Sequence, residues 1–372
     1  MTMIQHQTRA FGSPSRYIQG RCELENLREY TDAYGKKVFI LVDTFFFKEY
    51  KEKFEAMYAG GDSTVIVEEF SGEITAEKID EIAEGLRAFG PEVVAGMGGG
   101  KTMDTAKAVS DIFKAVTVII PTTASTDAPT IGLSVIYTET GEHVGPRHYV
   151  KNPDLVLLDT DIISKAPVRF LIAGMGDALA TFIETRANLQ SHSPNYVGKG
   201  FCSTIAVGAI AEACHKTILE KGARARRAAE RGLCTIDVED VIEANTLLSG
   251  LGVQNSSCAG AHSIAEGITV LPACQKLLHG EVVAFGILVQ LMIEGRTNEE
   301  IEEIYAFFRE VGLPSTFADL GLENVTDEEI MSVAEESLKS YWDVEPFPVT
   351  AQMIHDAMIL ADIQGRRFKA QA

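Results

Sequence analysis

The sequence contains no apolar run long enough to cross a membrane. A membrane-spanning helix needs about 20 consecutive apolar residues, and polar residues interrupt every apolar stretch here before that length is reached. The first 20 residues also lack the long apolar stretch of a signal peptide. We therefore predict that the protein has no membrane partner and is not secreted.

Paired cysteines are also missing. The chain has 6 cysteines, and none of them form a Cys-x-x-Cys pair. In a chain of this length, scattered cysteines are typical of reduced thiols in a protein core and not of a disulfide framework. This pattern predicts a cytoplasmic protein.

Basic side chains are too few for a polyanion partner. Lys and Arg number 33 against 53 Asp and Glu, which gives a net charge of −20. This balance argues against nucleic acid and anionic membranes as partners. A hydrophobic content of 46% with only 12 prolines indicates a well-packed globular protein, and 372 residues favour two domains.

The first part of the chain alternates strand and helix patterns. Buried-strand patterns cover 37–43, 63–70, 91–98 and 115–123, with a helical pattern at 76–90 and another after the third strand. Such alternation predicts a parallel sheet with helices on both faces. The segments 133–145 and 148–160 are interpreted as extended pieces appended to that sheet.

Helical periodicity dominates the rest of the sequence. Strand patterns end near Ser164, and we predict helices at 168–190, 196–221, 238–251, 258–269, 280–294, 297–311, 327–339 and 350–368. The expected fold is an α/β, Rossmann-like domain at 1–163 followed by an all-α domain at 164–372. Ligands commonly bind in a cleft between two such domains.

A glycine-rich stretch, Gly98-Gly99-Gly100-Lys101, lies where the third strand passes into a helix. It is not a P-loop, because Ala95 occupies the position of the first glycine, and it lacks the third glycine of the usual dinucleotide fingerprint. Its glycines would still let a diphosphate approach the helix N-terminus, where Lys101 adds positive charge. The alternative is a tight turn without a ligand.

Asp43 ends the first of these strands. A carboxylate there can accept both hydroxyls of an adenosine ribose and repel a 2′-phosphate, which favours NAD over NADP. By itself, such a residue is more often a surface side chain. The loop 121–130, rich in Ser and Thr, follows the fourth strand and would line the same site.

Three residues of the helical part could bind a metal. Asp177, His262 and His279 lie on separate, mostly apolar helical segments. Each has an ordinary explanation, a helix cap for Asp177 and a buried core residue for either histidine. Together, two imidazoles and a carboxylate form a three-ligand divalent site with an open position, which is typical of a catalytic metal.

The sequence as a whole resembles the iron-containing (group III) alcohol dehydrogenases, and especially those members that oxidise glycerol. The matching segments run in order through most of the chain: SPSRYIQG, GMGGGKTMDTAKAV, PTTASTDAPT, KNPDLVLLDT, KAPVRFLIAGMGDALATFIE, EANTLLSGLG, AHSIAEG and HGEVVAFG. The resemblance implies a dehydroquinate synthase-like fold, a homo-oligomer, and NAD-dependent oxidation of glycerol or a similar vicinal diol to the hydroxyketone.

The resemblance also implies roles for individual residues. Asp177, His262 and His279 would bind Zn(II), with Fe(II) as the alternative, and would contact the substrate together with Asp127. Asp43 would bind the adenosine ribose of NAD. The remaining cofactor residues would be Gly99, Gly100, Lys101, Asp104, Thr122, Thr123, Leu133 and Tyr137.

The chain departs from the family pattern at Ile131, where a serine is expected, and at Ala265 and Glu266, where a second histidine and its neighbour are expected. These departures bear on substrate preference and leave the three metal ligands intact. Other readings are another small-alcohol dehydrogenase, an enzyme acting on a phosphorylated substrate, and a non-enzymatic NAD-binding protein. A phosphorylated substrate would need several Lys and Arg side chains, which the segments around the metal ligands do not offer.

Overall fold

The computed structural model describes residues 8–370, which divide into two compact units. One unit comprises Gly12–Ala124 and Ala128–Ala166. The other comprises the segment from Pro167 onward together with Ser125–Asp127 and the described residues up to Phe11. The domain borders at 163 and 164 remain a prediction.

The first unit is built on a parallel, six-stranded sheet with the strand order β1-β8-β5-β4-β2-β3. Strands β2, β4 and β5 are short apolar runs that are almost wholly buried, as expected when both faces of a parallel sheet are covered. The strands of this sheet are β1 (Arg16–Gly20), β2 (Lys37–Asp43), β3 (Thr64–Phe70), β4 (Val93–Gly98), β5 (Val116–Pro121) and β8 (Leu155–Asp159).

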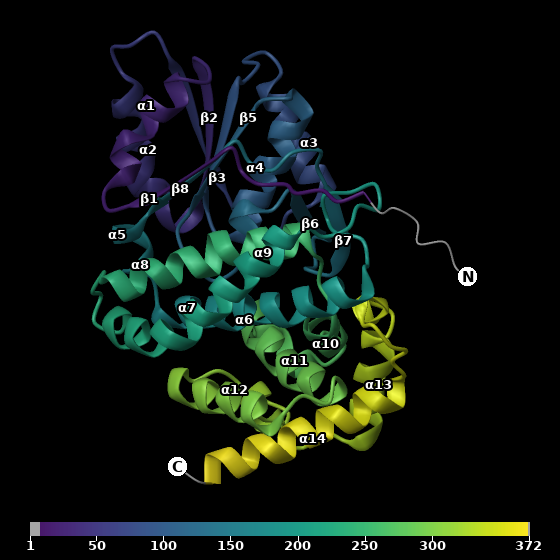
Figure 1. Cartoon of the computed structure of the whole chain (residues 1–372). Coiled ribbons are helices and arrows are strands. Elements are labelled where there is room, and N and C mark those ends of the chain that lie inside the picture. The colour runs from purple at the N-terminus through teal and green to yellow at the C-terminus, as the bar shows by residue number, and fades with distance from the viewer. Residues whose placement is uncertain (1–7, 371–372) are drawn as a thin grey trace. The chain divides into compact units, whose positions relative to one another are not determined.

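Helices cover both faces of this sheet (Figure 1). Helices α1 and α2 cover one face, where Leu27 and Phe54 pack in one core cluster with apolar residues of β2 (Val38, Ile40 and Val42). On the second face, Gly96 of β4 lies against α4, where an added Cβ would be 2.6 Å from the Cβ of Ala106. The helices of this unit are α1 (Leu27–Asp32), α2 (Thr44–Tyr58), α3 (Ala76–Leu86), α4 (Gly100–Phe113) and α5 (Thr160–Ile163).

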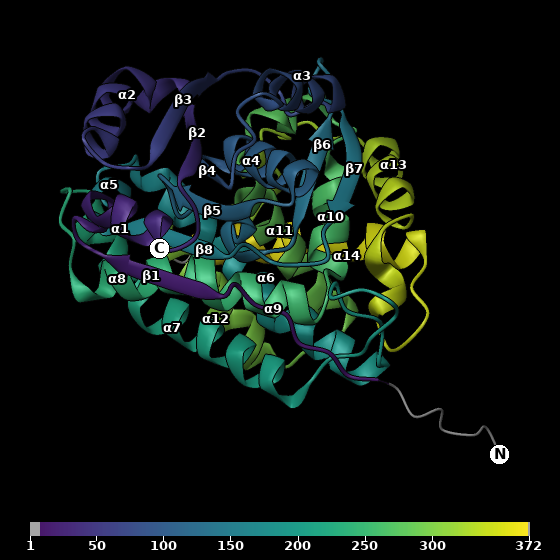
Figure 2. The ribbon, with the colours of Figure 1, turned by 90° about the horizontal axis from the view of Figure 1, so that it is seen from above.

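One of the two predicted additions to the main sheet is wrong and the other is confirmed. The segment 133–145 is not appended to the main sheet, because β6 (Leu133–Tyr137) pairs antiparallel with β7 (His143–His148) as a separate two-stranded sheet (Figure 2). The segment 148–160 does join the main sheet as predicted, because β8 pairs parallel with β5. Strand β1, which the sequence analysis did not predict, forms the edge beside β8.

The strand order reverses between β2 and β4. From β2 the chain continues outward to β3 and then returns to form β4 on the other side of β2. In open α/β sheets, ligands bind beyond the carboxyl ends of the strands at such a switch point. Asp43 ends β2 and Gly98 ends β4, so the fold brings both to this position.

The second unit is helical. Helices α6 and α7 pack along one another, as do α10 and α11, and α14 packs against α11 and α13 (Figure 1). Its helices are α6 (Val168–Ser191), α7 (Ile205–Ala229), α8 (Ile236–Glu243), the π-helix η3 (Ala244–Leu248), α9 (Ser249–Asn255), α10 (Gly260–Ile268), α11 (His279–Ile293), α12 (Asn298–Val311), α13 (Asp327–Ser337) and α14 (Ala351–Ala370).

The predicted helix at 196–221 is wrong at both ends. Helix α7 begins at Ile205, because Gly198, Lys199 and Gly200 all have positive φ and the preceding segment is irregular. The helix then continues to Ala229. Among the described residues, no helix is both long and apolar enough to span a membrane.

Candidate metal centre and cofactor loop

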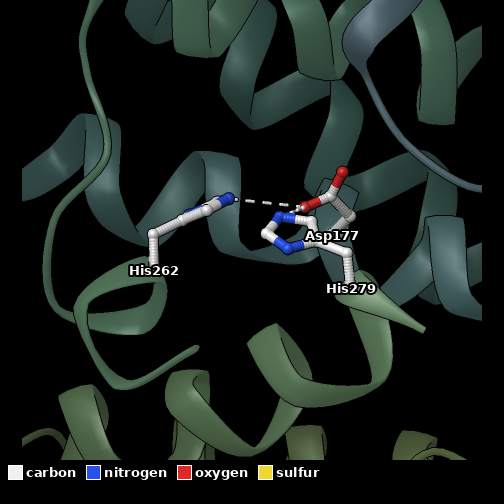
Figure 3. Close-up of side chains that lie close together, drawn as sticks. All are labelled: Asp177, His262 and His279. Carbon is white, nitrogen blue, oxygen red and sulfur yellow. Dashed lines mark ion pairs between the residues drawn. The ribbon is translucent and has the colours of Figure 1, made fainter. Parts of the chain in front are cut away.

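Asp177, His262 and His279 converge from three helices of the second unit (Figure 3). The Nε2 atoms of His262 and His279 each lie 3.5 Å from Oδ1 of Asp177. Asp177 lies in the interior of α6, so the alternative that it caps a helix is wrong. His262 lies in α10, and His279 is the first residue of α11.

These distances fit a tetrahedral cation. Two ligand atoms about 2.1 Å from such a cation lie about 3.4 Å apart, close to the 3.5 Å between Asp177 Oδ1 and each Nε2. Oδ1 of Asp177 is also buried without a hydrogen-bond partner. A buried carboxylate oxygen is costly in that state, and a divalent cation between the three atoms would satisfy it.

Close contacts between glycines and neighbouring helices allow this convergence. Gly176 precedes Asp177, and a Cβ on it would lie 2.3 Å from the carbonyl oxygen of Gly280. A Cβ on Gly280, which follows His279, would lie 1.9 Å from the carbonyl oxygen of Ala173. Only residues without a Cβ fit these positions, so α6 and α11 come together at the two ligands.

Glu184 orients His262, one of the three candidate ligands. Its Oε2 lies 2.7 Å from Nδ1 of His262, and its Oε1 accepts hydrogen bonds from the backbone amides of Ala259 and His262 at 2.8 and 3.0 Å. Because the carboxylate accepts the proton of Nδ1–H, Nε2 keeps its lone pair for a metal. Sequence reasoning missed Glu184, although it lies two turns after Asp177 on the same face of α6.

Cys258 also lies close to His262. Its Sγ groups with Glu184 and His262 as a second possible set of ligand atoms. However, the 2.7 Å separation of Nδ1 and Oε2 is that of a hydrogen bond and is too short to admit a cation between these atoms. The Asp177 side of His262 is therefore the better metal position.

Asp127 is connected directly to this cluster. Its backbone N–H donates to Oδ2 of Asp177 at 3.2 Å, and Oδ2 of Asp127 accepts from Ser249 Oγ at 3.2 Å. Burial and the negative charge of Asp177 raise the pKa of Asp127 to about 8. Burial alone would also raise the pKa of Asp177, but His262, His279 and the Asp127 amide hold it below its usual value.

Among the residues flagged as departures, Glu266 lies one turn after His262 on α10. Its Oε2 accepts a hydrogen bond from Ser340 Oγ, and the side chain is half-buried. Ala265 and Ile131 are buried. Glu266 therefore adds a further carboxylate near the histidine ligands.

The cofactor residues predicted from the glycine-rich stretch lie at the carboxyl end of β4. Gly99 caps α4 and Gly100 is its first residue. Apart from the chain neighbours and the nearby backbone of α4 itself, no atom of the described chain lies within 4 Å of a Cβ built on either residue, so the space beside the first turn of α4 stays open. This opening, together with the free amides of a helix start, fits a diphosphate.

Asp43 and Lys101 already have partners within the chain. The Asp43 carboxylate accepts from the Phe45 amide at 2.9 Å and caps α2. Lys101 forms an ion pair with Glu73, and half of its side chain is exposed. Capping of α2 is by itself a sufficient structural role for Asp43. Because Asp43 also lies at the switch point of the sheet, binding of the adenosine ribose stays a proposal.

The other predicted cofactor residues surround the same end of the sheet or lie on β6. The Thr122 amide donates to the Gly98 carbonyl at 3.2 Å, and Thr123 follows it. Asp104 is buried, and its carboxylate accepts from Lys107 at 3.0 Å and from the Val135 amide at 2.9 Å, so it ties α4 to β6. Burial raises the pKa of Asp104, although Lys107 opposes the rise. Leu133 and Tyr137 are the first and last residues of β6.

Comparison with known proteins identifies the class. The sequence pattern described as "Iron-containing alcohol dehydrogenase" matches residues 14–160. The chain is 43% identical over 359 residues to the glycerol dehydrogenase of Thermotoga maritima, covering 96% of this chain and 97% of that protein. It therefore belongs to the iron-containing alcohol dehydrogenase family and is an oxidoreductase, which confirms the resemblance.

Two further relatives support this assignment. The glycolaldehyde reductase of Halobacterium salinarum is 39% identical over 366 residues, which cover 97% of this chain and 99% of that protein. The crystal structure of glycerol dehydrogenase from Schizosaccharomyces pombe superposes with a TM-score of 0.93 at 36% identity, covering 98% of this chain and 93% of that one. The predicted fold class is thus confirmed, and family membership supports NAD and a metal ion as cofactors.

Proposed function

We propose that this enzyme oxidises glycerol, or a similar vicinal diol, to the corresponding hydroxyketone with NAD and a divalent metal. For glycerol the product is dihydroxyacetone. The observation that carries the proposal is the cluster of Asp177, His262 and His279 with Asp127 hydrogen-bonded to it. The relative named glycerol dehydrogenase, aligned over nearly the whole chain, supports the choice of substrate.

The metal would be Zn(II), with Fe(II) as the alternative, because two imidazoles and one carboxylate suit either ion. Asp177 Oδ1 and the Nε2 atoms of His262 and His279 would hold it. Glu184 would keep the His262 proton on Nδ1 throughout the reaction. When bound, the metal supplies Lewis-acid polarisation of an alcohol oxygen, and NAD supplies the hydride acceptor.

Overall, the secondary alcohol loses a proton and a hydride, and the products are the ketone, NADH and a proton. Asp127 would accept a hydrogen bond from the hydroxyl beside the reacting carbon. A buried group that must bond a hydroxyl disfavours substrates that lack one. Diols should therefore react better than monohydric alcohols.

The charges around the cation position also bear on the substrate. Asp127, Asp177 and Glu184 are all buried carboxyl groups, and Glu266 lies nearby. A phosphorylated polyol or sugar acid would bring negative charge next to Asp177, whose lowered pKa keeps its carboxylate ionised. This arrangement disfavours the alternatives that act on phosphorylated substrates.

We assign NAD binding to residues 1–163 and metal binding to residues 164–372. Asp43 would accept the hydroxyls of the adenosine ribose, and Gly99, Gly100 and Lys101 would bind the diphosphate. The remaining contacts proposed for the cofactor are Asp104, Thr122, Thr123, Leu133 and Tyr137. Assembly as a homo-oligomer in the cytoplasm remains a prediction.

The test is a coupled measurement of metal content and substrate range. Purified enzyme is loaded with Zn(II) or Fe(II), and NADH formation is followed with glycerol, propane-1,2-diol and propan-2-ol. We expect metal-dependent turnover with a higher kcat/KM for both diols. Faster reduction of glycolaldehyde than oxidation of any diol would instead favour the activity of the Halobacterium relative, and no turnover with any of these substrates would refute the proposal.

A further inference from the structure

The Asp127 carboxylate is the end of a buried chain of hydrogen bonds. Ser249 Oγ donates to Asp127 Oδ2 at 3.2 Å, and Thr181 Oγ1 lies 2.8 Å from Ser249 Oγ. The exposed fractions of Thr181, Ser249 and Asp127 are 1%, 0% and 8%, so these bonds form away from bulk water. When Asp127 is ionised, Ser249 gives its single proton to the carboxylate, and Thr181 is then the donor to Ser249.

Rigid elements hold the two hydroxyl groups. Thr181 lies one turn after Asp177 on α6, so it shares a face with a metal ligand. Ser249 begins α9 immediately after the π-helix η3, and π-helical turns are rare and occur often at functional sites. Gly252 brings α9 close to α6, since a Cβ on it would lie 2.1 Å from Cγ2 of Thr181.

We propose that Ser249, oriented by Thr181, is a positioning residue that sets the rotation of the Asp127 carboxylate and so the enzyme's preference for diols. Two contacts of Asp127 bear on its orientation, that of its amide with Asp177 Oδ2 and that of its Oδ2 with Ser249. The first contact fixes the residue relative to the metal ligand. The second contact fixes the rotation of the carboxylate, so that its other oxygen can accept a hydrogen bond from the neighbouring hydroxyl of the substrate.

This inference rests on the proposed role of Asp127 as the acceptor for the second hydroxyl. A monohydric alcohol has no second hydroxyl to donate to that acceptor, so its kcat/KM should not depend on the orientation of the carboxylate. Loss of a hydrogen bond to a carboxylate weakens an interaction by about tenfold or more. The expected effect of removing either hydroxyl is therefore a loss of about tenfold in the ratio of kcat/KM for diol to kcat/KM for monohydric alcohol.

The test compares three variants of the full-length, metal-loaded enzyme. Ser249→Ala removes the donor to Asp127. Thr181→Val removes the second hydroxyl but keeps a methyl group against Gly252, and Thr181→Ser keeps the hydroxyl. We expect Ser249→Ala and Thr181→Val to raise KM for propane-1,2-diol with little change in kcat/KM for propan-2-ol, and Thr181→Ser to retain the preference for the diol.

A double-mutant cycle with Asp127→Ala separates this inference from the proposed function. If Ser249 acts through Asp127, Ser249→Ala causes no further loss of diol preference in the Asp127→Ala background. Equal losses for diol and monohydric alcohol, or the same loss with and without Asp127, would overturn the positioning role alone. Asp127→Ala with an unchanged diol preference would overturn both proposals, and if Ser249→Ala does not fold, the two Thr181 variants decide the question.

Discussion

The backbone amide of Asp127 donates a hydrogen bond to Oδ2 of Asp177, while Oδ1 of the same carboxylate faces the imidazoles of His262 and His279. One side chain thus serves two purposes. One oxygen faces the proposed cation position, and the other holds the residue proposed to bind the substrate. A change at Asp177 is therefore expected to affect metal binding and substrate binding together.

Replacement of Glu184 by Gln should weaken metal binding. The amide group of Gln has a single acceptor oxygen, whereas Glu184 accepts two backbone amides and His262 Nδ1. The altered partner would favour a proton on Nε2, where it blocks the metal. We expect Zn(II) affinity to fall by about 10–100-fold, measured by competition with a chelator.

The matched control is Glu302→Gln, which changes an exposed glutamate on α12. Its Zn(II) affinity should equal that of the unchanged enzyme. If Glu184→Gln bound Zn(II) as tightly as this control, Glu184 would not be orienting a metal ligand.

Replacement of Gly280 by Ala should force α6 and α11 apart, because the added Cβ would lie 1.9 Å from the Ala173 carbonyl oxygen. We expect the free energy of unfolding to fall by about 1–3 kcal/mol, with weaker Zn(II) binding. Thermal unfolding and metal titration measure the two effects. Gly85→Ala in α3 serves as the control, because the added Cβ meets open space. This substitution should stabilise the helix by up to about 1 kcal/mol.

Asp43 allows charge and helix capping to be separated. Asn caps helices as well as Asp does, so Asp43→Asn should keep the bond from the Phe45 amide while losing the charge. We expect it to bind NAD more weakly and to discriminate less against NADP. Asp43→Ala should show the same change in cofactor preference and lose about 1 kcal/mol of stability in addition.

A cofactor preference that stayed the same in both Asp43 variants would leave capping as the only role of this residue. Steady-state kinetics with NAD and NADP, together with thermal unfolding, distinguish these outcomes.

Gly99 tests the proposed diphosphate site. Apart from its chain neighbours and the nearby backbone of α4, a side chain at this position meets no atom of the described chain within 4 Å of its Cβ, so Gly99→Val should barely change the thermal unfolding temperature. The same side chain would occupy the space proposed for the diphosphate, and NAD affinity should fall by at least about tenfold, measured by NADH fluorescence titration. Unchanged affinity would place the cofactor elsewhere.

The sequence was sufficient to predict the parallel sheet and the helical second part, because strongly apolar strands and periodic helices determine them locally. It also pointed to Asp177, His262 and His279 as ligands, since two imidazoles and a carboxylate in mostly apolar helices are costly unless they have partners. The sequence could not predict which atoms of the three side chains approach one another, because these residues are far apart in the chain and converge only through helix packing.

There are physical reasons why one strand and two functional residues could not be predicted from the sequence. Strand β1 is short and partly polar because it forms an edge of the sheet. Glu184 has the sequence signature of any glutamate on a helix, and its role depends on His262, which lies on a different helix. Ser249 becomes significant only through its contact with Asp127, across 122 residues of sequence.

The most direct test of the metal centre is a crystal structure of the Zn(II)-loaded enzyme with anomalous scattering measured at the zinc edge. We expect one strong peak about 2.0–2.2 Å from Asp177 Oδ1 and from the Nε2 atoms of His262 and His279. An empty position between these atoms, or a peak bound instead by Cys258 and Glu184, would contradict this expectation.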